Sequence, residues 1–341
     1  METEYAWEEL SDQDLLKLRI RDLKLRLENS DIYPLIQTVE KELRDKGLSI
    51  QTRLYIGDEW FSPEDTVAIS IPFFLTHPRL RQLERKMMYD CEGEKEADFL
   101  KLLRHEFGHV FDHAFKVSRR KKWKKVFGDN TKDYQPEAYR ARPYSRNFVH
   151  NISDQYAQAH PDEDFAESFA VWLDPKSNWR VFYKNWPALK KVQYVESLSR
   201  EFSEKKVLPA KGRMIADAKS LSTSLEHYYK RKKKYLKTDL PDFYNADLKK
   251  IFLLPEDGRK KSKLASSYLR RQRKFLVTIL APWTKERKII INQILNKLIF
   301  RSRESKLLLP EDEAQMQSAL IAYLASLLTR YRMTGRWNPK L

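Results

Sequence analysis

Alternating apolar and polar side chains predict β-strands in the first quarter of the chain. Residues 50–56 and 66–71 alternate in this way on either side of a turn region at Gly57, which is typical of paired strands. Residues 16–27 alternate as well, with leucine or isoleucine between lysine and arginine. We therefore expect an earlier strand or strand pair over residues 16–27.

Apolar side chains spaced three and four residues apart predict helices over most of the remaining chain. Ser30 is a suitable N-cap for a helix over residues 31–46, and Gly47 is a stop signal after it. Residues 94–115 form a longer pattern with a wide apolar surface, which predicts a buried helix. Another helix is expected to begin at Pro161. The remaining predicted helices cover residues 189–202, 263–280, 283–300 and 311–331, the last opened by Pro310 and closed near Gly335.

The segment His105-Glu106-Phe107-Gly108-His109 lies within the helix predicted over residues 94–115. Residues four apart lie on the same face of a helix, so His105 and His109 can hold one metal ion. Glu106 follows His105 and projects beside the metal, where a carboxylate can act as a general base on bound water. This arrangement is HExxH, two zinc ligands and a base. A histidine pair on the surface of an ordinary helix is the alternative interpretation.

A catalytic zinc site needs a third protein ligand and one open position. His113 lies eight residues past His105, roughly 12 Å along the helix axis, so it cannot share the metal unless the helix breaks. The metzincin spacing fails because Phe115 stands where its third histidine would be. Glu163 and Glu167 share one face of the helix expected from Pro161. One carboxylate can bind the metal while the other accepts the free N–H of a ligand histidine. A solvated acidic helix start is the alternative.

These segments resemble gluzincin metallopeptidases. The run from Tyr156 to Glu167, YAQAHPDEDFAE, resembles that of bacterial zinc-binding metallopeptidases. It is also similar to the protease domain of anthrax lethal factor, in which HEFGH recurs and a tyrosine precedes the ligand glutamate by the same interval. The resemblance extends from about Ile50 to Trp186. It implies one zinc ion and the following roles: His105, His109 and Glu163 as ligands, Glu106 as base, Glu167 as the carboxylate behind a ligand histidine, and Tyr156 as the transition-state stabiliser. For Tyr156, a structural hydroxyl bonded to a backbone carbonyl is the alternative.

Composition limits the cellular setting. Cys91 is the only cysteine of the 341 residues, which excludes an internal disulfide and a cysteine-based zinc cluster and suits a reducing compartment. The N-terminus is acidic and lacks an apolar segment, so no secretory signal is expected. The longest apolar run, residues 319–328, is too short to span a bilayer. We therefore expect a cytoplasmic protein without a membrane span.

The positive charge of the chain is concentrated in its C-terminal part. Residues 201–341 contain 32 Lys and Arg against 14 Asp and Glu, whereas the remainder contains 33 against 34. Residues 228–235 combine a basic run with three tyrosines, a pattern found in nucleic-acid-binding segments. A solvated helix face is the other interpretation of that run. The asymmetry predicts an acidic partner, either nucleic acid or an anionic surface.

Together these patterns predict an α+β protein with two parts. Residues 1–204 are expected to form a zincin-like catalytic domain with a small mixed sheet and an active-site helix. Residues 205–212 are expected to be a linker, and residues 213–341 an all-α basic region. The predicted function is hydrolysis of peptide bonds by a zinc-dependent metallopeptidase. The alternative is a nucleic-acid- or anion-binding protein whose metal site is structural or vestigial.

Two segments are candidates for contacting a peptide or protein substrate. Residues 66–71 can serve as the sheet edge that pairs with an extended substrate backbone, although an inner strand fits the pattern equally well. Arg142 and Arg146 lie in a loop that leads to Tyr156. Because arginine binds carboxylates bidentately, this loop can hold an acidic side chain or a C-terminal carboxylate. An arginine-rich surface loop paired with Glu137, Asp133 or Asp154 is the alternative.

Overall fold

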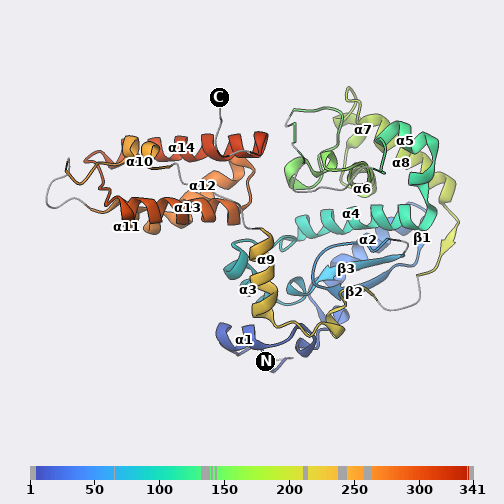
Figure 1. The fold of residues 1–341 in the computed structure, drawn as a ribbon. Helices are drawn as coiled ribbons and strands as arrows, with labels where there is room; N and C mark the ends of the chain where they lie inside the picture. The colour runs from blue at the N-terminus through green and yellow to red at the C-terminus, as the bar shows by residue number, and fades with distance from the viewer. Residues whose placement is uncertain are drawn as a thin grey trace. The chain divides into compact units, whose positions relative to one another are not determined.

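The chain forms two compact units, residues 1–230 and residues 231–341, in a computed structural model (Figure 1). The structure describes residues 5–64, 66–131, 139, 141–142, 144–209, 214–236, 244–256, 263–335 and 337. The division predicted at residues 205–212 stays a prediction. Within that segment, Lys206 and Val207 form a short strand.

The strands of the first unit form two parallel pairs within the described residues. Strand β2 (Arg53–Gly57) pairs with β3 (Ala68–Pro72), and β1 (Ser49–Ile50) pairs with β4 (Lys206–Val207). The strands predicted over residues 50–56 and 66–71 are confirmed with shifted bounds. All five residues of β3 are buried, so this strand lies inside the core. Strands beside many helices confirm the α+β class.

The strand predicted over residues 16–27 is wrong. This stretch contains the end of helix α1 (Asp12–Lys17) and two 3₁₀ turns, η1 (Ile20–Leu23) and η2 (Leu27–Asn29). Only Arg19 forms a β-bridge there, with Ser224. From Ile20 onward every apolar side chain of this stretch is buried, while the polar side chains between them are exposed, which produces the alternation without a strand.

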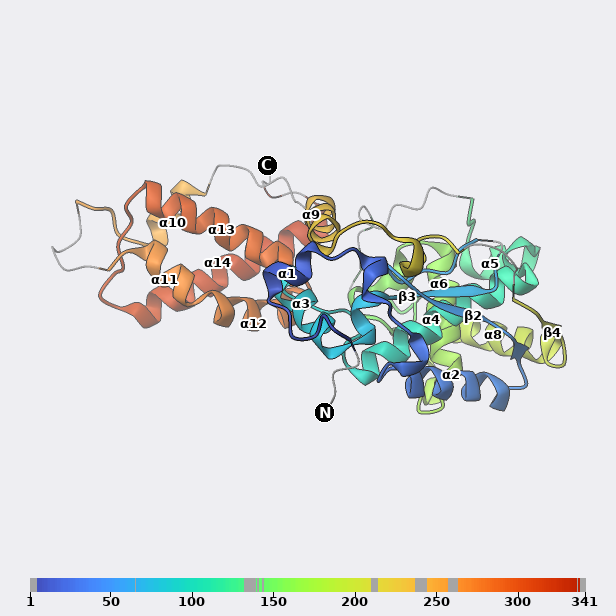
Figure 2. The same cartoon turned by 90° about the horizontal axis from the view of Figure 1, so that it is seen from below.

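Long helices surround the sheet pair β2–β3. Helix α4 lies between that pair on one side and helices α6 and α8 on the other (Figures 1 and 2). It is a buried helix, as its wide apolar surface predicts. After α1, the helices that lie within this unit are α2 (Tyr33–Asp45), α3 (Pro78–Met88), α4 (Glu96–Phe115), α5 (Lys121–Phe127), α6 (Pro161–Leu173), α7 (Trp179–Phe182) and α8 (Leu189–Phe202), and α9 (Leu225–Tyr235) begins in it.

A buried ion pair fixes α4 against α2. The Arg104 guanidinium donates to both carboxylate oxygens of Glu42, over 2.8 and 2.7 Å, and both side chains are less than 10% exposed. Asp174, directly after α6, lies 3.5 Å from the same guanidinium. Two carboxylates therefore satisfy a buried cation, as burial of charge requires. Arg104 thus joins α4 to α2 and to the end of α6, one residue before His105.

The second unit is helical and basic. Residues 231–341 contain 26 Lys and Arg against 10 Asp and Glu. Helix α13 is its centre, with seven buried isoleucine and leucine residues. The helix predicted over residues 263–280 is divided at Gln272, and Gly335 ends the last helix with a φ of 68°. Its helices are α10 (Asn245–Ile251), α11 (Ala265–Arg271), α12 (Arg273–Thr284), α13 (Lys288–Glu304) and α14 (Glu313–Thr334). None of the described helices combines the length and the apolar character needed to cross a bilayer.

Candidate metal centre

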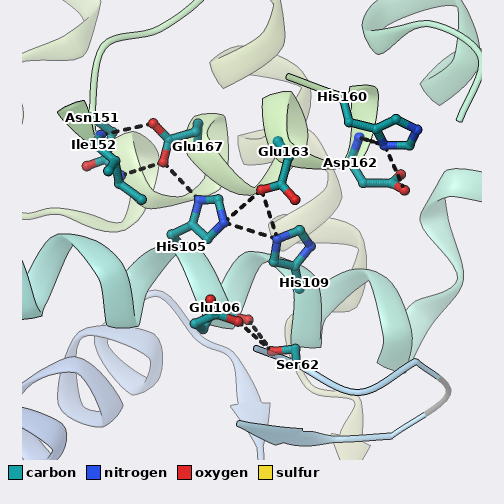
Figure 3. Close-up of polar contacts among 10 residues, drawn as sticks. All are labelled: Ser62, His105, Glu106, His109, Asn151, Ile152, His160, Asp162, Glu163 and Glu167. Carbon is teal, nitrogen blue, oxygen red and sulfur yellow. Dashed lines mark hydrogen bonds and ion pairs between the residues drawn. The ribbon is translucent and has the colours of Figure 1, made fainter. Parts of the chain in front are cut away.

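Helix α4 carries the HExxH residues into the interior of the first unit. His105 and Glu106 are 3% and 6% exposed, and His109 is half-buried. Figure 3 shows His105 and His109 pointing toward α6, whereas Glu106 points toward Ser62 on another side of the helix. The interpretation of the two histidines as an ordinary surface pair is therefore wrong.

Helix α6 approaches α4 closely because both helices have small residues where they meet. A Cβ atom placed on Gly108 would lie 2.7 Å from the Ala166 Cα and 3.1 Å from the Ala166 carbonyl oxygen. Only a glycine permits this separation without displacing one of the backbones. The close approach brings the α6 carboxylates within reach of the α4 histidines.

Three side-chain atoms converge between the two helices. The Glu163 Oε2 lies 3.0 Å from the His105 Nε2 and 3.4 Å from the His109 Nε2, and the two nitrogens are 3.1 Å apart. Tetrahedral zinc with ligands at 2.0–2.1 Å holds neighbouring ligand atoms about 3.3 Å from one another. The Glu163 Oε2 is also buried and accepts no hydrogen bond from the described residues. The three residues therefore fit a zinc ion, which would satisfy that oxygen.

Glu167 orients His105 from behind. Its Oε1 lies 2.8 Å from the His105 Nδ1 and accepts from the Asn151 Nδ2 over 2.9 Å, while its Oε2 accepts from the Ile152 N–H over 2.9 Å (Figure 3). Because a carboxylate occupies Nδ1, Nε2 is the nitrogen through which His105 can bind a metal between the two helices. The acidic start of α6 is buried, so the interpretation of a solvated acidic helix end is wrong.

The carboxylates of α6 and the histidines of α4 also shift one another's pKa values. Burial lowers the pKa of His105, but the neighbouring carboxylates of Glu163 and Glu167 outweigh burial and raise that pKa well above the usual value. Burial raises the pKa of Glu163, yet the charges of His109 and His105 lower it below its usual value overall. The pair therefore favours an ionised carboxylate, the form that binds a metal.

Glu106 lies apart from the three convergent atoms and has a different partner. The Ser62 hydroxyl is 3.1 Å from the Glu106 Oε2 and 3.2 Å from the Glu106 carbonyl oxygen. Burial raises the pKa of Glu106, although His109, His105 and the Ser62 hydroxyl act in the opposite direction. A carboxylate with a raised pKa is suited to accept and return a proton near neutral pH. Sequence reasoning missed Ser62, because a lone serine in a turn region 44 residues away carries no signal.

Of the residues near the start of α6, Tyr156 contacts a candidate zinc ligand, whereas His160, Asp162 and Asp164 have other partners. The Tyr156 ring lies next to His105, with ring centroids 5.8 Å apart. His160 caps α6 and its Nδ1 lies 3.3 Å from the Asp162 Oδ2, so these two residues pair with each other (Figure 3). Asp164 binds the Lys191 ammonium on the far side of α6, and burial raises the pKa of this carboxyl to about 7.

The two arginines of the predicted substrate loop occupy separate places. The Arg142 backbone exchanges hydrogen bonds with the Gln158 side chain, at 2.8 and 3.1 Å, which joins the loop to the turn that carries Tyr156. The exposed Arg146 places its guanidinium 5.9 Å from the Trp186 ring. Two of the acidic residues expected as alternative partners, Asp133 and Glu137, lie outside the described residues. Substrate binding by these arginines stays a prediction.

The prediction that residues 66–71 form an open edge for substrate is corrected at Ser70. The Ser70 N–H donates to the Phe61 carbonyl over 2.9 Å, while β2 pairs with the other side of β3. The strand is therefore bonded on both sides there, as the inner-strand alternative expects. The connection between β2 and β3 joins the sheet to Glu106 through Ser62.

Comparison with known proteins gives one match. Residues 78–229 match the model of a family described as "Putative zinc-binding metallo-peptidase". The match includes the whole of α4 and α6, and it supports a metallopeptidase. Neither the curated proteins nor the solved structures contained a protein similar to this chain.

Proposed function

We propose that the protein is a gluzincin-type metallopeptidase that binds one zinc ion and hydrolyses peptide bonds. The observation that carries the proposal is the convergence of His105, His109 and Glu163, with the buried carboxylate of Glu106 on the same helix, directly after His105. The three candidate ligand atoms are 3.0–3.4 Å apart, and three protein ligands are the number that a catalytic zinc site uses beside a water molecule. The family match over residues 78–229 supports the same class of enzyme.

The residues of the pocket divide the work of hydrolysis. A bound zinc ion would lower the pKa of water to about 7 and polarise the substrate carbonyl. Glu106 accepts the proton of the attacking water and passes a proton to the leaving amine. Its burial supports this role. A raised pKa makes the carboxylate a stronger base, so it accepts a proton from water more readily.

Tyr156 and Glu167 assist in different ways. The Tyr156 hydroxyl donates a hydrogen bond to the oxygen that gains charge as the substrate carbonyl becomes tetrahedral. The ring contact with His105 supports this role. Glu167, itself held by Asn151 and the Ile152 N–H, keeps the His105 ring in one orientation. A ligand that cannot rotate keeps the site in its binding geometry before the metal arrives.

For the substrate, we propose a preference for peptides with a free C-terminal carboxylate held by Arg142 and Arg146. The backbone link between Arg142 and Gln158 supports this, because it couples the arginine loop to the Tyr156 turn. One peptide with a free and with an amidated C-terminus should differ in kcat/KM in the wild type. The difference should shrink in Arg142→Ala and Arg146→Ala. Equal kcat/KM for both peptides would mean that the arginines do not bind the C-terminal carboxylate and have only a structural role.

For the basic unit, residues 231–341, we propose an acidic partner. Its excess of 26 basic over 10 acidic residues supports this part of the proposal. If the chain were only a nucleic-acid- or anion-binding protein, the metal site would be structural. A structural zinc site has four protein ligands and needs no base, so the buried Glu106 favours catalysis.

Metal analysis combined with digestion of a peptide library tests the proposal. The wild type should retain zinc after dialysis and cleave peptides, and a chelator should abolish both. Glu106→Gln should retain zinc and lose turnover, because an amide cannot accept the proton. Glu163→Ala should lose zinc itself. Cleavage by the metal-free protein, or more than a few per cent of wild-type turnover in Glu106→Gln, would refute the proposed mechanism.

A further inference from the structure

Ser62 offers its hydroxyl to two acceptors of the same residue. The distances to the Glu106 Oε2 and to the Glu106 carbonyl oxygen are 3.1 and 3.2 Å, so the hydroxyl lies between side chain and backbone. One hydroxyl proton can serve only one acceptor at a time. A bond to Oε2 fixes one oxygen of the carboxylate and leaves Oε1 for a proton in transfer. Ser62 therefore contacts the Glu106 carboxylate at one of its two oxygens.

The segment that carries Ser62 is attached to the sheet at two points. The buried Ser70 donates from its N–H to the Phe61 carbonyl over 2.9 Å and from its hydroxyl to the Glu59 carbonyl over 2.8 Å. The Phe61 ring meets Tyr55 edge-on, with centroids 6.4 Å apart. Residues 59–62 therefore follow β3 closely, and their position is determined by packed neighbours rather than by the turn alone.

A third attachment comes from helix α9, far along the chain. The buried Tyr228 donates from its hydroxyl to the Glu59 Oε1 over 2.8 Å and reaches the Asp58 carbonyl at 3.1 Å. Its ring also packs edge-on against Phe73, with centroids 5.1 Å apart. The hydroxyl thus holds the beginning of the segment whose end contacts Glu106. Residues 58–62 are bonded at one end to α9 and at the other to the base.

We propose that Ser62 is a positioning residue for Glu106, and that Tyr228 acts on Glu106 through it by holding residues 58–62 in place. The proposal rests on the proposed function, because it concerns the base of that reaction. Loss of the Ser62 hydroxyl lets the Glu106 carboxylate rotate, so its proton-accepting oxygen faces the water for a smaller fraction of the time. The zinc ligands lie on α4 and α6 and keep their contacts. The effect falls on turnover and leaves zinc and substrate binding intact.

Steady-state kinetics on the zinc-loaded full chain tests this. Ser62→Ala should lower kcat about tenfold, the range expected for a hydrogen bond to a charged group, with KM within about twofold. Zinc affinity, measured by competition with a chelator, should not change. Ser62→Thr keeps the hydroxyl and should recover most of the lost kcat. A merely structural serine would not produce this division between kcat, KM and zinc affinity.

The connection to α9 has a matched control in the adjacent tyrosine. Tyr228→Phe should lower kcat about threefold, because the hydroxyl acts one step removed from Glu106. Tyr229→Phe should leave kcat unchanged, since that equally buried residue faces Glu84. In the Ser62→Ala background, Tyr228→Phe should have no further effect, because its route to Glu106 is already broken.

Several results would overturn the assignment. Unchanged or increased kcat in Ser62→Ala would show that the contact does not position the base. Additive losses in the double variant would separate Tyr228 from Ser62, and failure of Ser62→Thr to recover activity would exclude the hydroxyl. A wild-type protein without zinc-dependent hydrolysis would overturn the proposed function first. A wild type that is active, with Ser62→Ala equal to it, would overturn only this inference.

Discussion

Replacing Gly108 by alanine should damage the metal centre without touching a ligand. In an ordinary helix the change stabilises by about 1 kcal/mol, because glycine is the poorer helix former. Here the new Cβ would lie 2.7 Å from the Ala166 Cα, whereas carbon atoms in contact are normally 3.5–4.0 Å apart. Since the neighbour is backbone, α6 must move away by about 1 Å.

The magnitude follows from this displacement. Overpacking of a core costs about 1–3 kcal/mol, which exceeds the gain in helix propensity, so net destabilisation of about 1–2 kcal/mol is expected. Glu163 moves with α6. A shift of about 1 Å would open its 3.0 and 3.4 Å separations from His105 and His109, while metal sites tolerate only about 0.2 Å. Zinc affinity should fall at least tenfold.

Two measurements check the prediction. Urea unfolding with chelator present gives the stability of the metal-free protein, and competition with a chelator gives zinc affinity. Lys101→Ala, at an exposed position of the same helix, is the control and should change neither quantity. A Gly108→Ala protein that is as stable as the wild type and binds zinc as tightly would refute the reasoning. It would mean that α4 and α6 can separate without moving Glu163.

Three further predictions concern single side chains. Glu167→Ala should lower zinc affinity about 10–100-fold in the same competition assay, since His105 loses its acceptor and Asn151 loses a partner. A zinc affinity equal to that of the wild type would show that Glu167 does not orient His105. Tyr156→Phe should lower kcat in steady-state assays with little change in KM, because only the transition state uses the hydroxyl; a pure KM effect would make Tyr156 a substrate contact. Burial raises the pKa of Cys91 from 9.0 to about 12, so at pH 8 the folded protein holds about a thousandfold less thiolate than an ordinary cysteine. Thiol labelling should therefore be slow in the native protein and fast in urea, and equal rates would contradict the burial.

The helices were the most predictable part of the fold, because their apolar spacing is local. The helix expected over residues 94–115 is α4 (Glu96–Phe115), and the one expected from Pro161 is α6 (Pro161–Leu173). Alternation is a weaker guide. It predicts β2 and β3, but over residues 16–27 it arises from turns that bury the apolar side chains and expose the polar ones between them. The segment expected as a linker contains β4, whose pairing with β1 joins residues more than 150 positions apart.

The metal-binding half of the site could be predicted because its residue types are chemically restricted. Zinc takes histidine and carboxylate at helical spacing, so HExxH and the pair Glu163 and Glu167 stand out in the sequence. Gly108 lies inside that motif, but its role depends on Ala166, 58 residues away. No periodicity encodes how closely two helices approach. The sequence therefore predicts the candidate ligands, which the structure brings together, but not the packing that brings them together.

The partner of Glu106 could not be predicted from the sequence for a related reason. The histidines and Glu106 leave α4 in different directions, so they need different neighbours (Figure 3). The histidines meet carboxylates, which are among the few side chains that bind zinc. Glu106 needs only a hydrogen-bond donor, and any serine, threonine, amide or backbone N–H can supply one. Because the requirement is so loose, only the fold identifies Ser62. Substitution of Ser62 thus asks whether a general base in this arrangement must be held as firmly as the metal ligands are.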